Sequence, residues 1–83
     1  MQARMGVITS KQCRAARGVL GWEQKDLARE SLVSDQTIRR FEKDQHTPKP
    51  ATLLLLRLAF ERAGITFLDT DDDGVEGARW PSG

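Results

Sequence analysis

Apolar residues recur at helical spacing near the start of this 83-residue chain. Three of them stand three and four positions apart, which is the spacing of one helix face: Cys13, Ala16 and Leu20. Thr9 or Ser10 is suited to cap the start of such a helix, and Gly21 is suited to end it in the left-handed conformation. The pattern therefore predicts a first helix over residues 10–20.

The segment over residues 22–45 predicts two shorter helices joined by a tight turn. The first covers residues 24–31, about two turns. The second begins at Ser34, whose hydroxyl can accept a hydrogen bond from an unpaired backbone N–H. Its inward stripe is Ile38 and Phe41, and its other residues are mostly polar or basic. Helices this short bury little surface alone, so we expect their pairing to have a purpose beyond stability.

Residues 50–64 predict a longer helix, with Pro50 in its first turn and Gly64 at its end. Its inward stripe consists of Leu53, Leu56, Ala59, Phe60 and Ala63. Leu54, Leu55 and Leu58 are surplus to that face. A helix apolar over so much of its girth is buried on more than one side, and in a small chain a partner subunit is the simplest cover.

The last part of the chain changes from helical to extended patterning. Ile65–Leu68 predicts a short strand and Ala78–Trp80 a weaker one, joined by a polar, glycine-containing connection. We expect an antiparallel β-hairpin packed on the last helix, or a strand shared between subunits, because a bare hairpin is marginally stable. The predicted fold is all-α: a compact four-helix domain over residues 9–64, a flexible N-terminal arm over 1–8, and a hairpin and dimerisation tail over 65–83.

Three motifs lie along the predicted helices: Leu20-Gly21-Trp22-x-Gln24-x-x-Leu27-Ala28, then Val33-Ser34-x-x-Thr37-Ile38-x-x-Phe41-Glu42, then Thr47-Pro48. A turn that sets a polar and basic second helix on the surface is the helix-turn-helix arrangement. Over about Ile8 to Ala63 the chain resembles the lambda-repressor/Cro-like (XRE) family. The resemblance implies a helical DNA-binding regulator, usually dimeric. Leu32 and Asp44 stand where the family commonly has glycine, and a positive φ at Leu32 would cost about 1 kcal/mol.

Arg17 falls on the apolar stripe of the first helix. The family commonly pairs an arginine here with a glutamate late in the recognition helix, which is Glu42 in this chain. Such a pair fixes geometry more than it stabilises, yet removing one partner can cost about 3–5 kcal/mol. The alternative is that Arg17 extends along its aliphatic stem to solvent.

Charge is divided unevenly along the chain. Residues 1–50 carry ten Lys/Arg against six Asp/Glu, a net +4, while residues 51–83 carry three against six, a net −3. The basic half contains the helix pair, where a polyanion would dock. The single cysteine, Cys13, permits neither an internal disulfide nor a zinc cluster and suits a small core position. The first ten residues lack an apolar signal core and no long apolar stretch follows, which favours a cytoplasmic protein with no membrane partner.

A recognition helix, here about residues 34–44, points its N-terminal end toward base edges in the major groove. The residues predicted to contact bases are Ser34, Asp35, Gln36 and Arg40. Gln36 suits adenine, Arg40 suits guanine, and Asp35 can accept a hydrogen bond from cytosine. Alternatively, Asp35 complements the helix dipole and Arg40 is a solvated surface charge.

The residues predicted to contact phosphates surround that helix: Gln24, Thr37, Arg39, Lys43 and Lys49. The family resemblance implies this role for Gln24, which opens the first short helix, and for Lys43, which closes the second. Thr37 also matches a position that often touches the DNA backbone, although packing within the helix explains it equally well.

Other chemistries are poorly supported. Asp69-x-Asp71-x-Asp73-Gly74 matches half of an EF-hand loop, but Trp80 stands where the closing acid belongs. The single histidine, His46, has no assured partner and suits a cap or a phosphate contact better than a reaction. We therefore predict no enzyme, metal, cofactor or small-molecule substrate.

The sequence thus predicts a sequence-specific regulator of double-stranded DNA, acting as a homodimer on a near-palindromic operator. The predicted dimer interface consists of Leu54, Leu55, Leu58, Ile65, Phe67 and Trp80. The alternative function is a protein-interaction module, such as an antitoxin-like or anti-repressor partner, that uses the last helix and the hairpin. Binding to random duplex DNA separates the two.

Overall fold

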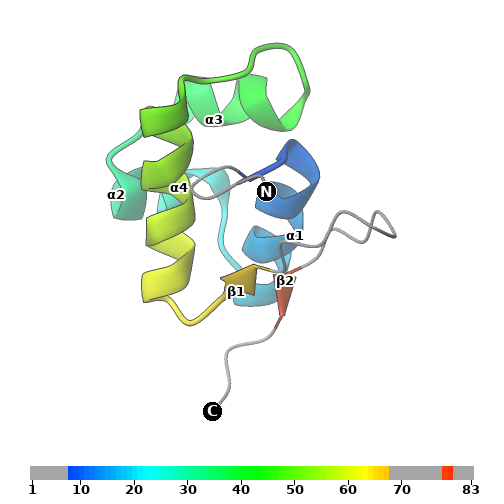
Figure 1. Ribbon diagram of the computed structural model, residues 1–83, viewed down its shortest axis with the longest axis vertical. Coiled ribbons are helices and arrows are strands. Elements are labelled where there is room, and N and C mark those ends of the chain that lie inside the picture. The colour runs from blue at the N-terminus through cyan, green and yellow to red at the C-terminus, as the bar shows by residue number, and fades with distance from the viewer. Residues whose placement is uncertain (1–7, 68–77, 80–83) are drawn as a thin grey trace, which may run out of the picture.

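The computed structural model describes residues 8–67 and 78–79. In this part of the chain four helices are followed by two very short strands (Figure 1). The elements are α1 (Ser10–Leu20), α2 (Gln24–Ser31), α3 (Asp35–Glu42), α4 (Pro50–Arg62), β1 (Thr66–Phe67) and β2 (Ala78–Arg79). The four predicted helices are all present, and the domain is mostly helical. None of its described helices combines the length and the apolar content needed to cross a membrane.

Local signals set the helix ends. Thr9 Oγ1 accepts from the backbone N–H of Gln12 at 3.0 Å, and Gln12 Oε1 accepts from the N–H of Thr9 at 2.9 Å, a reciprocal capping box. Gly21 ends α1 with φ 70°, and Ser34 Oγ caps α3 by accepting from Thr37 N–H at 3.1 Å. Since each signal is local in sequence, the predicted ends of α1 and α2 agree with the structure. The helix α3 lies inside the predicted range 34–44, and α4 ends at Arg62, two residues before the predicted Gly64.

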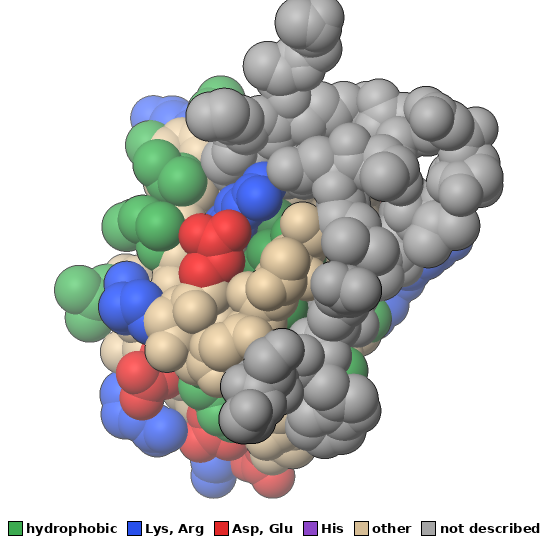
Figure 2. Space-filling model, turned by 60° about the horizontal axis from the view of Figure 1, so that its bottom comes forward, with side chains coloured by type: hydrophobic (Ala, Val, Ile, Leu, Met, Phe, Trp, Pro, Cys, Tyr) green, Lys and Arg blue, Asp and Glu red, His purple; other side chains and the backbone are tan. Residues whose placement is uncertain are grey.

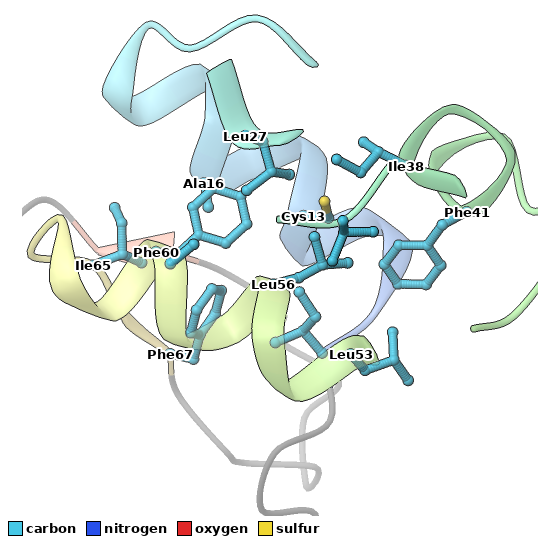
Figure 3. Close-up of a cluster of buried hydrophobic side chains, with 13 residues drawn as sticks. Cys13, Ala16, Leu27, Ile38, Phe41, Leu53, Leu56, Phe60, Ile65 and Phe67 are labelled. Carbon is cyan, nitrogen blue, oxygen red and sulfur yellow. The ribbon is translucent and has the colours of Figure 1, made fainter. Parts of the chain in front are cut away.

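The core lies where the four helices converge (Figure 3). Its largest fully buried side chains are Ile8, Cys13, Leu27, Ile38, Leu56 and Phe60. The ring of Phe60 stacks on Trp22 with centroids 5.8 Å apart, and it meets the edge of Phe67 at 5.9 Å. This aromatic series joins α4 to the chain between α1 and α2 and to β1, and it closes one end of the core.

The two strands lie at the end of the molecule opposite α3 (Figure 1). They pair antiparallel, with Thr66 opposite Arg79 and Phe67 opposite Ala78. We expected this pair to pack on α4, but β2 also lies beside α1. Residues 1–7 of the predicted arm, the connection over 68–77 and Trp80 lie outside the described residues, so the arm and the complete hairpin stay predictions. Ile8, the last residue assigned to the arm, is buried in the core.

Ile65 and Phe67 correct the predicted dimer interface. Both side chains are buried in the chain's own core rather than exposed for a partner. Phe67 packs against Phe60, and the guanidinium of Arg57 lies 5.5 Å from its ring centroid. The chain turns back after Gly64 and lays these residues over the end of α4, which would otherwise leave the core open. An apolar strand pattern alone does not distinguish these two kinds of burial.

Leu32 and Asp44 both adopt positive φ, at 65° and 59°. Asp44 is partly compensated, because its carboxylate accepts a hydrogen bond from Ser10 Oγ at 2.5 Å. Leu32 has a Cβ in the left-handed region and a side chain that is 87% exposed. Its conformation therefore carries a backbone cost that packing of its own side chain does not offset.

Replacing Leu32 by glycine should stabilise the fold by about 0.5 kcal/mol. Relief of the left-handed strain contributes about 1–2 kcal/mol, and the greater freedom of glycine in the unfolded chain removes about 0.5–1 kcal/mol. The midpoint of thermal unfolding should rise by about 2–4 °C. Leu32→Asn, which tolerates positive φ and restricts the unfolded chain more than glycine, is the matched comparison. Loss of stability in both variants would show that the leucine side chain contributes to the fold.

Candidate nucleic-acid interface

The carboxylate of Glu42, the last residue of α3, is the centre of a buried polar cluster. The residue is 5% exposed, and Arg17 on α1 binds it with two hydrogen bonds. Arg17 Nε lies 2.7 Å from Oε2 and Arg17 Nη2 lies 2.7 Å from Oε1. This two-point geometry is the strong form of an arginine–carboxylate contact. The predicted pair is therefore present in the structure, and Arg17 does not simply extend to solvent.

Three further side chains hold the same glutamate. Gln24 Nε2 donates to Oε1 at 3.0 Å, and Cys13 Sγ lies 3.2 Å from Oε2. Arg14 donates to the backbone carbonyl of Glu42 and so caps the end of α3. Glu42 consequently ties α3 to both α1 and α2. Sequence periodicity carries no signal for the roles of Cys13 and Arg14, because both contacts span about thirty residues.

The cluster keeps Glu42 ionised. Burial raises the pKa of this carboxyl, but hydrogen bonds from Arg17, Gln24 and Cys13, together with the charge of Arg17, outweigh burial and leave the pKa below its ordinary value. The hydrogen bond to Glu42 raises the pKa of Arg17. Burial, reinforced by the neighbouring carboxylate, raises the pKa of the Cys13 thiol, so Cys13 is a neutral core residue.

The outer face of α3 is polar and exposed. Ser34, Asp35, Gln36 and Arg40, the residues predicted to contact bases, are all solvent-accessible. Asp35 Oδ2 also accepts from Arg39 Nη1 at 2.7 Å, one helical turn away. The i, i+4 spacing could have signalled this pair from the sequence. An exposed pair of this kind is worth at most about 1 kcal/mol, so DNA can displace it at small cost.

The residues predicted to contact phosphates divide into two groups. Arg39, Lys43 and Lys49 are exposed around α3 and at the start of α4. Gln24 is half-buried and its amide nitrogen is bonded to Glu42, while Thr37 Oγ1 accepts from Ser34 Oγ at 2.8 Å. Gln24 and Thr37 therefore support the recognition helix internally, whatever further contact they make.

Two short helices joined by a tight turn, with the second polar outside and anchored inside, define a helix-turn-helix DNA-binding domain. A family model described as Helix-turn-helix matches residues 14–65. The chain belongs to this family, in its lambda-repressor/Cro-like (XRE) branch, a family of DNA-binding domains rather than enzymes. A search of curated proteins gave no match.

Proposed function

We propose that the protein is a sequence-specific transcriptional regulator that binds double-stranded DNA through α3 in the major groove. The observation that carries this proposal is the anchoring of α3. Glu42 fixes its inner side to α1 and α2, while its outer side keeps several polar side chains free of the core. Side chains on a rigid helix approach base edges with little loss of conformational freedom.

Different residues in and around the recognition helix would contact bases and phosphates. We assign base reading to Gln36 and Arg40, with Ser34 and Asp35 nearer the helix start. We assign phosphate contacts to Lys43, Lys49 and Arg39, with smaller parts for Gln24 and Thr37. The proposed contacts involve no cofactor. Such a regulator would act in the cytoplasm.

Comparing two single variants tests this division. Arg40→Ala should weaken binding to the preferred duplex by about 1–3 kcal/mol and relax the preference at one base pair. Lys43→Ala should weaken binding to preferred and random duplexes by a similar factor, because a phosphate contact carries no sequence information. Fluorescence anisotropy with both duplexes measures the ratio. Equal effects of Arg40→Ala on both duplexes would refute its base-reading role, and failure of the parent to bind any duplex at low salt would refute the function.

We further propose that the protein binds as a homodimer through α4. Leu54, Leu55 and Leu58 are 42%, 44% and 38% exposed, so α4 keeps apolar surface on the side that does not face the core. Figure 2 shows hydrophobic side chains projecting along the left edge of the molecule, the side on which Figure 1 places α4. A twofold contact here would place two recognition helices about 34 Å apart, on successive turns of a near-palindromic site. Trp80 and the complete hairpin would extend the same interface.

Charge placed on the leucine cluster tests the dimer. Leu54→Glu and Leu58→Glu should shift the sedimenting species from dimer toward monomer and weaken binding to a palindromic duplex by about tenfold or more, through lost avidity. Binding to a half-site duplex should change little. Removing the chain after Gly64 is a poorer test, because it would delete the core residues Ile65 and Phe67. A parent protein that sediments as a monomer of 9.3 kDa at hundreds of micromolar would overturn this proposal.

The exposed leucines also favour a second candidate function, that of a protein-interaction module related to antitoxin or anti-repressor partners. In that case α4 and the strands would contact another protein. Absence of binding to random duplex at low salt, with retained folding, would select this function over DNA binding.

A further inference from the structure

An open groove of about 380 Å³ runs between the turn that joins α2 to α3 and the start of α4. Its apolar lining is Leu32, Val33, Pro48 and Leu55. Its polar lining is Ser34, Thr37, His46, Lys49 and Thr52. The groove thus combines an apolar wall, hydroxyl groups, the ammonium of Lys49 and the imidazole of His46. No carboxylate is among the lining residues.

Leu32 distinguishes this groove from an ordinary surface hollow. Its backbone is left-handed and its side chain is 87% exposed, so the residue is unfavourable both in conformation and in solvation. Its backbone N–H closes α2 by donating to Ala28 O at 2.9 Å, but a glycine would make the same bond, so this contact does not account for the leucine side chain. A residue whose backbone conformation and exposure are both unfavourable, with no compensating contact in its own chain, commonly has a functional role. The groove that Leu32 lines is where the compensation can come from.

We propose that this groove is the docking site of a partner protein segment that presents an apolar side chain together with carboxylates. The apolar side chain would cover Leu32, removing its exposed surface from water. The carboxylates would face Lys49 and the imidazole of His46, the ionisable groups among the lining residues. A DNA backbone would satisfy the cation but would leave Leu32 uncovered, so a protein segment suits the whole surface better.

The docked segment excludes DNA. Ser34, Thr37 and Lys49 line the groove, and the same residues belong to the proposed DNA-binding face. A segment lying across them would occupy the space of a phosphate backbone. This part of the inference rests on the proposed function, and it gives the regulator a means of release from DNA by a partner.

A short synthetic peptide that alternates leucine and glutamate is the probe. Titrated into the isotope-labelled protein, it should shift the backbone amide resonances of Val33, His46 and Thr52. Peptides with glutamine in place of glutamate, or serine in place of leucine, should bind at least about tenfold more weakly. The first loses the charge contacts with the groove, and the second loses the apolar contact. No shifts at millimolar peptide, or equal binding of the three peptides, would overturn the docking site.

Leu32→Gly provides the sharper test, because it is expected to be more stable than the parent. It should weaken peptide binding about tenfold or more while its DNA binding persists. Lys25→Ala, which alters an exposed residue of α2 outside the groove and outside the proposed interfaces, is the control and should bind the peptide as the parent does. Undiminished peptide binding by Leu32→Gly would overturn the proposal.

A competition experiment between peptide and labelled duplex distinguishes failure of the docking proposal from failure of the proposed DNA binding. The peptide should displace labelled duplex from the parent but not from Leu32→Gly. Peptide and duplex bound together would overturn the exclusion. Failure of the parent to bind duplex at all would instead refute DNA binding, while the peptide titration would still decide whether the groove docks a protein.

Discussion

Replacing Glu42 by alanine should lower the free energy of unfolding by about 3–5 kcal/mol. The variant leaves the guanidinium of Arg17 facing the core without its carboxylate, and it removes the acceptor for Gln24 and Cys13. The side chain of Arg17 is 21% exposed, so water reaches it and the loss should lie toward the lower end. The midpoint of thermal unfolding should still fall by at least about 12 °C. Urea denaturation gives the same free energy independently.

Replacing Arg17 by alanine should lower the free energy of unfolding by at least as much. Arg17→Ala leaves a carboxylate whose side chain is 3% exposed without its principal partner. The double variant Arg17→Met with Glu42→Leu should recover most of the loss, because two apolar side chains need no compensation inside the core. The parent, Arg17→Met, Glu42→Leu and the double variant form a thermodynamic cycle that isolates the pair. Single variants that melt like the parent would show that the pair adds nothing to stability.

Lowering the pH should remove the stability that ionised Glu42 contributes to the fold. The folded pKa of Glu42 lies below its ordinary value of 4.5, so the unfolded state takes up a proton first as the pH falls. The stability from this group is fully present above the unfolded pKa and is lost as the pH falls through the folded pKa. A Glu42→Gln variant lacks this titration, and its stability should fall less steeply below about pH 4.5.

The helices were predictable from sequence because their signals are local. Apolar spacing gave the inner face of α1, and single residues such as Thr9, Gly21 and Ser34 gave the ends. The Arg17–Glu42 pair came from the family resemblance rather than from spacing, since 25 residues separate the two partners. Sequence periodicity places a residue on a face, but it does not state which distant residue faces it.

The other differences between prediction and structure concern whether an apolar residue packs in the core or stays exposed. Ile65 and Phe67 have the pattern of an interface and of a core alike, and the return of the chain over α4 decides for the core. Leu54 and Leu58 have the same composition and remain exposed, because α4 offers only one side to the domain. The groove beside Leu32 was not predictable, since it depends on the approach of a turn and a loop about fifteen residues apart.

DNA affinity should fall steeply with salt. Exposed cations surround α3, with Lys43 at its end, Arg39 on its outer side and Lys49 at the start of α4. Neutralising about three phosphates per subunit predicts a slope of roughly −3 for log affinity against log salt, and about twice that for a dimer. Between about 50 and 200 mM salt, a dimer should lose about 10³–10⁵ in affinity. Titrations of one duplex at several salt concentrations give the slope directly.

Two variants should move this slope in opposite directions. Lys43→Ala removes one phosphate contact and should make the slope shallower by about one per subunit. Asp35→Asn frees Arg39 from the ion pair at 2.7 Å and removes a negative charge from the DNA-facing side, so random duplex should bind more tightly and the slope should steepen. Affinity for the preferred duplex should gain less, because Asp35 also loses its carboxylate toward cytosine. Binding that is unchanged between low and moderate salt would refute the phosphate contacts of all three cations.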